Sequence, residues 1–246
     1  MKGSMVCTIA LTLILSGAAT GVEIPGYVAR AIANRSRSDA ERKADRTRLP
    51  AETIAFAGVA PGMVIAEFIP FYGYFTRLLC DVVGIKGKVY GIENLDWSNT
   101  AFDKQLTGQR RNVRLQRTKW GEFELPEKVD LFWITQNYHD LHVGEYGYVD
   151  VAAFNRRVFD ALKPGGFYLV VDQAANPGTP EKKIAVLHRI DEAQVIREVT
   201  AAGFALIDQS DALRHPNDDR TRSIFDASVR GRTDEFMLKF QKPSLP

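Results

Sequence analysis

The sequence predicts an α/β protein built on a doubly wound, mostly parallel sheet, and three observations support this fold class. Predicted strands alternate with predicted helices along most of the chain, which is the order expected of parallel strands joined by crossover helices. Residues 129–135 (VDLFWIT) and 167–171 (FYLVV) are nearly continuous apolar runs, as expected of strands covered on both faces. The 246 residues, 45% of them hydrophobic, are enough for one large domain with a full core.

Short apolar runs bounded by turn residues mark the predicted strands. The first begins after the Pro61-Gly62 turn, and the others follow at intervals that leave room for a helix or a loop. We predict strands over residues 63–68, 88–92, 112–115, 129–135, 167–171, 204–207 and 235–240.

Apolar residues at helical spacing, with capping residues beside them, mark the predicted helices. Asp150 and Asp191 can each cap a helix, because a short acidic side chain accepts hydrogen bonds from the first free amides. Gly58, the 164–166 segment (PGG) and Gly203 are expected to end helices. We predict helices over residues 51–57, over 75–83, from a Ser98 cap across 102 and 106, from 150 across 162, and from 191 to 202.

The first 21 residues have the three-part pattern of a secretory signal peptide. Lys2 gives a positive start, residues 6–15 form an apolar run, and residues 16–21 are all small. The apolar run is shorter than the ~20 residues of a membrane-spanning helix; a buried N-terminal strand or helix is the alternative. We therefore expect a periplasmic or secreted protein that meets a membrane only during export.

The density of charged residues distinguishes a short extension from one domain in the rest of the chain. Residues 22–49 form a charged N-terminal extension, in which residues 31–48 suggest a solvated helix or arm, and residues 50–246 form the domain. The formal net charge is only +2, from 32 basic and 30 acidic residues. Nothing in this balance favours nucleic acid as a partner, so we expect a small-molecule ligand or substrate.

Polar residues follow several predicted strands, at the edge where an open parallel sheet binds its ligands. Glu67 lies at the end of the first strand, Glu93 follows the second, and Asp172 follows the fifth. The loop 136–142 (QNYHDLH) follows the fourth strand. A carboxylate in the position of Glu93 can accept hydrogen bonds from both hydroxyls of a ribose. The sequence therefore predicts a binding crevice at this edge.

Several segments carry a family resemblance. LKPGG (162–166) is widespread in one superfamily, and QNYHDLH and LHRID (187–191) are more specific to a group within it. On these segments, and on AFAGVAPGM, YFTRLL, GKVYGIEN and FDASVRGRTDEFMLKF, the chain from about residue 50 to 243 resembles the class I S-adenosylmethionine-dependent methyltransferases. Within them it is similar to a bacterial, often signal-bearing group of unassigned substrate. The resemblance implies a Rossmann-like, seven-stranded sheet whose last strand is antiparallel.

The resemblance also implies S-adenosylmethionine as cofactor. Glu67 would hold the amino end of the methionine, Gly73 keeps the last glycine of the family's first loop, and Glu93 would bind the ribose. Asn137 is implied as a further cofactor-binding residue.

The loop after the fourth strand is where such enzymes present their substrate and catalytic groups. Tyr138, His139 and Asp140 would orient or deprotonate an acceptor oxygen or nitrogen, with His139 as the base. The implied acceptor is an unidentified small molecule.

The first loop departs from the family pattern, because Ile69 and Phe71 replace two glycines. Glycine permits positive φ and close approach of a ligand to the backbone, whereas a β-branched residue strongly disfavours that conformation. We expect neither residue to adopt left-handed dihedrals, and Phe71 or Tyr72 to fill part of the pocket. Cofactor binding is then weakened or lost.

Two further interpretations compete with an active methyltransferase, which remains the favoured one. The alternative is a non-catalytic, exported small-ligand-binding protein on the same fold, with aromatic residues lining a remodelled pocket. A metal site would use His139, Asp140, His142 and perhaps His188, but their spacing matches no recognised zinc signature. We predict no metal site.

Overall fold

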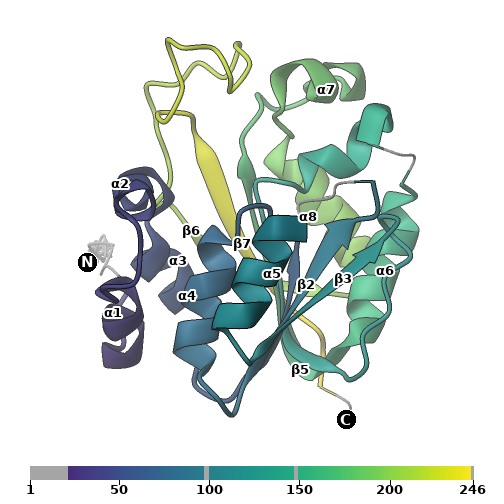
Figure 1. Cartoon of the computed structure of the whole chain (residues 1–246). Coiled ribbons are helices and arrows are strands. Elements are labelled where there is room, and N and C mark those ends of the chain that lie inside the picture. Colours follow the sequence, from purple (N-terminus) through teal and green to yellow (C-terminus); the bar gives the residue numbers. More distant parts are fainter. Residues whose placement is uncertain (1–21, 97–99, 147–148, 245–246) are drawn as a thin grey trace, which may run out of the picture.

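The computed structural model contains one seven-stranded sheet with the strand order β3-β2-β1-β4-β5-β7-β6 (Figure 1). It describes residues 22–96, 100–146 and 149–244, so the predicted signal peptide and the predicted Ser98 cap lie outside the described residues. The strands pair in parallel, except that β7 runs antiparallel to both β5 and β6. The predicted fold class, including the antiparallel last strand, is confirmed.

All seven predicted strands are present, and all except β4 have shifted ends. Their bounds are β1 Val64–Phe68, β2 Lys88–Asn94, β3 Val113–Thr118, β4 Val129–Thr135, β5 Leu162–Gln173, β6 Ala205–Ser210 and β7 Glu235–Gln241.

One helix end is wrong in the prediction. The helix before β5 ends at Ala161, and the segment 164–166 lies inside the strand instead of stopping the helix. Pairing with β4 shifts register between Val129 and Leu131, and Gly165 takes a φ of 76°. Proline and glycine are tolerated in strands at such irregularities, so this segment starts β5 irregularly.

The helices are α1 Gly26–Ile32, α2 Asp39–Arg48, α3 Pro50–Ala57, α4 Tyr74–Val83, α5 Thr100–Gln109, α6 Val151–Ala161, α7 Ile184–Leu187 and α8 Glu192–Ala201. Short 3-10 turns are η1 His139–His142, η2 Gly144–Tyr146 and η3 Glu181–Lys183. Both predicted acidic caps are confirmed: Asp150 accepts from the amide of Ala153 and Asp191 from that of Ala193, each at 3.0 Å. Among the described residues, none of the helices is long and apolar enough to cross a bilayer.

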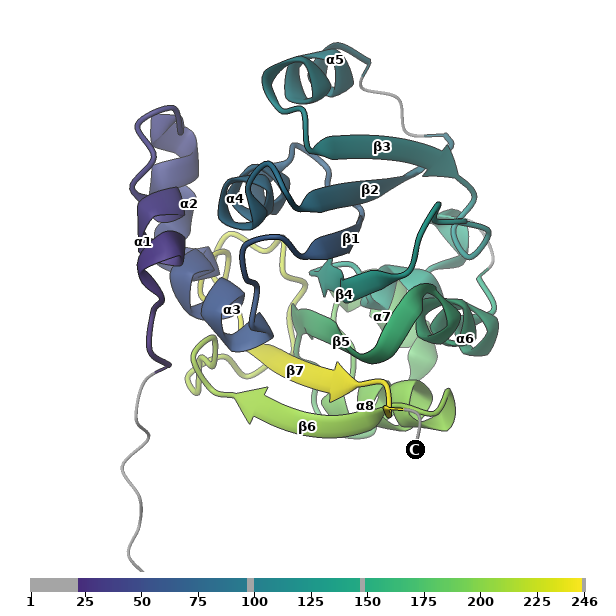
Figure 2. The ribbon, with the colours of Figure 1, turned by 90° about the horizontal axis from the view of Figure 1, so that it is seen from below.

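The sheet separates two apolar cores, because successive side chains of a strand point to opposite faces. In β4, Phe132 and Ile134 belong to one core, while Leu131 and Trp133 belong to the other. Helices α6 and α8 cover the first face, and α3 and α4 cover the second (Figure 2). Both faces of the central strands are therefore buried, and ligands can reach them only at their ends.

The charged extension forms two helices, not the single helix or arm predicted from residues 31–48. The second begins at a capping box, in which Ser38 and Glu41 satisfy each other's backbone amides, so the chain breaks before it. Helix α2 buries none of its residues but is tied to α4 by polar contacts: Arg77 pairs with Glu41 at 2.7 Å, and the hydroxyl of Tyr74 donates to Asp45 at 2.6 Å.

Candidate functional site

A pocket of about 490 Å³ opens at the carboxyl ends of β1 and β4. Its walls come from the β1–α4 loop, the loop after β4 and the turn at His188. The long segment before β7, drawn in yellow-green above the sheet in Figure 1, adds Ile224, Phe225 and Arg230. The pocket lies at the sheet edge where the sequence predicts a binding crevice, and its volume is within the usual range for small-molecule sites.

The β1–α4 loop keeps a glycine-like backbone although two of its glycines are replaced. Ile69 and Phe71 each have a φ of 55°, and Gly73 has a φ of 68°. The expectation that Ile69 and Phe71 avoid left-handed dihedrals is therefore wrong. A left-handed backbone at a residue other than glycine costs on the order of 1–2 kcal/mol. This cost reduces the stability of the folded protein and is already present without a ligand.

Packing around the loop accounts for its conformation. The side chain of Ile69 is only 5% exposed and belongs to the core under α6 and α8, so its burial offsets the backbone strain. Pro70 fits because Gly91 lies beneath it, where an added Cβ would come within 2.8 Å of the proline ring. Phe71 is 49% exposed and Tyr72 is 66% exposed; both line the pocket without closing it.

Glu67, at the end of β1, is the acid buried deepest in this pocket. It is 3% exposed, and its Oε2 atom has no hydrogen-bond partner among the described residues. Burial raises the pKa of this carboxyl to about 8, because desolvation disfavours the charged form, and the nearby Thr76 side chain opposes this rise only in part. A ligand that brings a cation would satisfy the free oxygen and restore the charge.

Glu93 and Gly73 lie next to the pocket but do not line it. Glu93 is 5% exposed, and burial, opposed in part by attraction to Arg117, raises its pKa to about 7. Its carboxyl accepts a hydrogen bond from the backbone amide of Phe71. Gly73 is the N-cap residue that precedes α4, so both residues shape the loop.

The loop after β4 brings three of its four predicted residues to the pocket. Asn137, His139 and Asp140 line it. The side chain of Tyr138 is fully buried on the other side of the loop, where its hydroxyl lies 3.0 Å from Glu198 and accepts from the Asn155 amide at 2.7 Å. The structure therefore does not bring Tyr138 to the acceptor position expected for it.

His139 is held by two carboxylates. Its Nδ1 lies 2.7 Å from Asp172 Oδ1, its backbone amide donates to Asp172 Oδ2 at 2.7 Å, and its Nε2 lies 3.2 Å from Asp140 Oδ1. Burial lowers the pKa of His139, but attraction to Asp172 and the hydrogen bonds to both acids outweigh it and raise the pKa to about 10. A raised pKa favours the protonated imidazole at neutral pH, and a protonated imidazole is poorly suited to the predicted role of His139 as a base.

Two further residues complete this cluster, and the sequence pointed to each only weakly. Asp172, at the end of β5, is fully buried, and its strand-end position is a signal that equally suits a cap. His188 follows α7 with a φ of 52° and places Nδ1 3.3 Å from His139 Nε2. His142 instead faces Glu198 and Glu181, at 3.2 and 3.3 Å.

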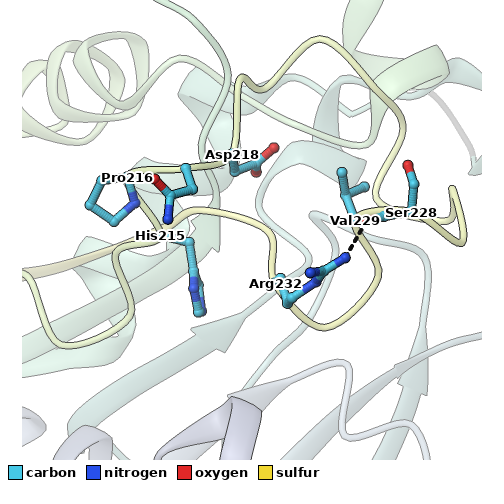
Figure 3. A pocket seen from close by; sticks show the side chains of 7 residues that line it. His215, Pro216, Asp218, Ser228, Val229 and Arg232 are labelled. Atoms are coloured by element: carbon cyan, nitrogen blue, oxygen red, sulfur yellow. Dashed lines mark hydrogen bonds between the residues drawn. The ribbon is translucent and has the colours of Figure 1, made fainter.

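A second hollow, of about 260 Å³, lies within the long segment before β7 (Figure 3). Its charged groups already have partners: Asp218 pairs with the buried Arg189 at 2.8 Å, and Arg232 donates to the carbonyl of Ser228 at 2.6 Å. The first pocket, with its unsatisfied acid and its place at the strand ends, is the better candidate for a functional site.

Comparison with known proteins identifies solved structures that share this fold. No protein-family model matches the sequence, and no curated protein matches it. Among solved structures, an S-adenosylmethionine-dependent methyltransferase from Aquifex aeolicus is 19% identical with a TM-score of 0.58, covering 84% of this chain and 100% of that one. The [4+2]-cyclase SpnF is 18% identical with a TM-score of 0.60, covering 89% and 92%. The glycopeptide N-methyltransferase MtfA, complexed with sinefungin, is 17% identical with a TM-score of 0.55, covering 80% and 87%. The chain thus has the Rossmann-like methyltransferase fold.

Proposed function

We propose that this protein binds S-adenosylmethionine in the pocket between the β1–α4 loop and the loop after β4, and transfers its methyl group to a small molecule. One observation carries the proposal: a buried, unsatisfied Glu67 oxygen lies beside a loop whose residues 69, 71 and 73 all have left-handed dihedrals. Solved methyltransferases of the same fold support the choice of ligand.

The residues present fit such a cofactor. Glu67 would bind the ammonium of the methionine part, because a buried carboxylate gains most from a cationic partner. Glu93 would stand beside the ribose, although the amide of Phe71 already uses part of its carboxyl. When bound, the cofactor supplies an activated methyl group for in-line displacement, which needs mainly alignment.

The loop after β4 would orient the acceptor. Asn137 donates to Asp140 Oδ2 at 2.8 Å, and hydrogen bonds to His139 and His188 outweigh the effect of burial and lower the pKa of Asp140. Asp140 therefore stays ionised at neutral pH and can accept a hydrogen bond from an acceptor hydroxyl or amine. His139 keeps its own proton and fixes the position of Asp140.

Calorimetric titration of residues 22–246 with S-adenosylhomocysteine tests the proposal. We expect one equivalent to bind with a dissociation constant below about 1 mM, or more than about 4.1 kcal/mol, because the loop needs no rearrangement. Adenosine and methionine, titrated separately, should each bind more weakly than the whole molecule. Absence of any heat at millimolar ligand, with folding verified by circular dichroism, would contradict cofactor binding.

One observation favours a second candidate, a binding protein without catalysis. Three aromatic side chains at the pocket are strongly exposed, namely Phe71 (49%), Tyr72 (66%) and Phe225 (60%). A cyclase shares the fold, so the fold itself does not demand methyl transfer. Binding of apolar small molecules with no response to S-adenosylhomocysteine would support this candidate.

We further propose that the mature chain is exported, on the strength of the charged start, apolar run and small residues of positions 1–21. All described helices and strands lie after this segment, the first being α1 at Gly26–Ile32. N-terminal sequencing of protein from its native host is expected to begin between Ala19 and Val22. A cytosolic chain that still starts at Met1 would contradict export.

A further inference from the structure

Three potential metal-binding side chains converge at one wall of the pocket. They are His139 and Asp140 from η1 and His188 from the turn after α7. His139 Nε2 lies 3.2 Å from Asp140 Oδ1 and 3.3 Å from His188 Nδ1, and these last two atoms are 3.8 Å apart. Three polar atoms from two distant segments therefore form a nearly regular triangle.

The size of this triangle suits a small divalent cation. A triangle with these sides has its corners about 2.0 Å from a common centre, which is the length of zinc–nitrogen and zinc–carboxylate bonds. We propose that His139, Asp140 and His188 form a binding site for one divalent transition-metal ion. The proposal is independent of cofactor binding, which would use Glu67 and Glu93. With a metal bound, His139 and Asp140 would hold the ion instead of orienting the acceptor directly, and His139 would no longer keep its Nε2 proton.

Neighbouring groups orient the ligands in the way that metal sites require. Asp172 lies 2.7 Å from His139 Nδ1, which directs Nε2 to the centre of the triangle, as in carboxylate–histidine–metal arrangements. Asn137 donates to Asp140 Oδ2 at 2.8 Å and leaves Oδ1 facing the two imidazoles. Binding would release the proton of His139 Nε2, because a ligating imidazole must be neutral on that nitrogen.

The ligand set indicates which metals would fit. Two imidazoles and one carboxylate suit zinc or ferrous iron and are poor ligands for magnesium or calcium, which prefer oxygen. All three residues line the pocket, so the open side of the triangle faces the space where a small molecule would lie. A site with three protein ligands keeps a position for water or substrate.

We predicted no metal site because the candidate ligands in the sequence match no known metal-binding spacing. That set of candidates included His142, and His188 lies 49 residues from His139. In the structure His142 binds Glu198 and Glu181, and the parallel bridge between Ala174 and Ile190 brings the His188 turn next to the end of β5. The ligand set is thus created by the fold and has no linear motif.

Titration of chelator-treated protein with Zn²⁺, and with Co²⁺ followed by its visible absorption, tests the proposal. Wild-type protein is expected to bind one equivalent of Zn²⁺. His188→Ala is expected to weaken binding by more than about 100-fold, and Asn137→Ala by about 10-fold or more, since it removes a group that orients Asp140. His188 is the variant of choice because it is the most exposed of the three ligands.

His142→Ala is the matched control, since it removes a histidine of the same turn that lies outside the triangle, and it is expected to bind Zn²⁺ like the wild type. The rival explanation is that the cluster is only an ion-pair network around His139. No stoichiometric binding by the wild type, or equal binding by wild type and the folded His188→Ala variant, would overturn the metal site.

Discussion

Replacing Asp172 by asparagine is expected to lower the free energy of unfolding by about 3–5 kcal/mol, the usual cost of removing one partner from a buried charge pair. Asp172 is fully buried, and both of its oxygens are used. Oδ2 accepts from the His139 amide, while Oδ1 faces His139 Nδ1 and accepts from the amide of Gln173, each at 2.7 Å. An asparagine leaves the buried imidazolium without its nearest counter-charge.

Chemical denaturation in the presence of a chelator measures this effect apart from any metal. Asp208→Asn is a matched control, because Asp208 is also a strand residue that accepts a bond from the following amide, at 2.9 Å, but it is exposed. Its change is expected to stay within about 0.5 kcal/mol. A loss below about 1 kcal/mol for Asp172→Asn would mean that His139 is not held as a buried cation.

Continuous runs of apolar residues predicted the central strands well. The irregular backbone at the start of β5 was not predicted. The run 129–135 has the same bounds as β4, because a strand buried on both faces must be apolar throughout. Strand β5 begins five residues before its predicted start. Proline and glycine at 164–166 signal a break of regular structure, and sequence alone does not tell a helix stop from a bulge.

The polar residues that follow the predicted strands correctly located the pocket in the sequence. Which way an individual side chain points could not be predicted from its place after a strand. Glu67, Asn137, His139 and Asp140 meet because the carboxyl ends of parallel strands share one edge. Tyr138 points the opposite way because η1 turns the chain directly after it, a rotation that depends on the 3-10 geometry. Ile69 shows the same limit: its side chain is held by the core, which outweighs a local backbone preference.

Glu67→Gln is expected to weaken S-adenosylhomocysteine binding at pH 8 by about 100-fold, or about 2.7 kcal/mol, the scale of a charged hydrogen bond lost from a buried site. The variant keeps the shape of the side chain but cannot carry a charge. Because burial raises the pKa of Glu67 to about 8, a proton competes with the ligand's ammonium below that pH. Wild-type affinity is therefore expected to rise from pH 6 towards pH 8, by up to roughly tenfold per unit.

Titrations at several pH values separate this electrostatic role from a purely structural one. The glutamine variant has no proton to lose, so its affinity should be flat from pH 6 to 7.5 and approach the wild-type value to within a few fold at about pH 6. Glu127→Gln is the control, because Glu127 pairs with Lys88 at the start of β2, at the opposite edge of the sheet, and should leave affinity unchanged. A wild-type affinity that stays flat or falls between pH 6 and pH 7.5 would show that Glu67 does not bind the ammonium, since a carboxyl with a raised pKa can gain its cation only by releasing a proton.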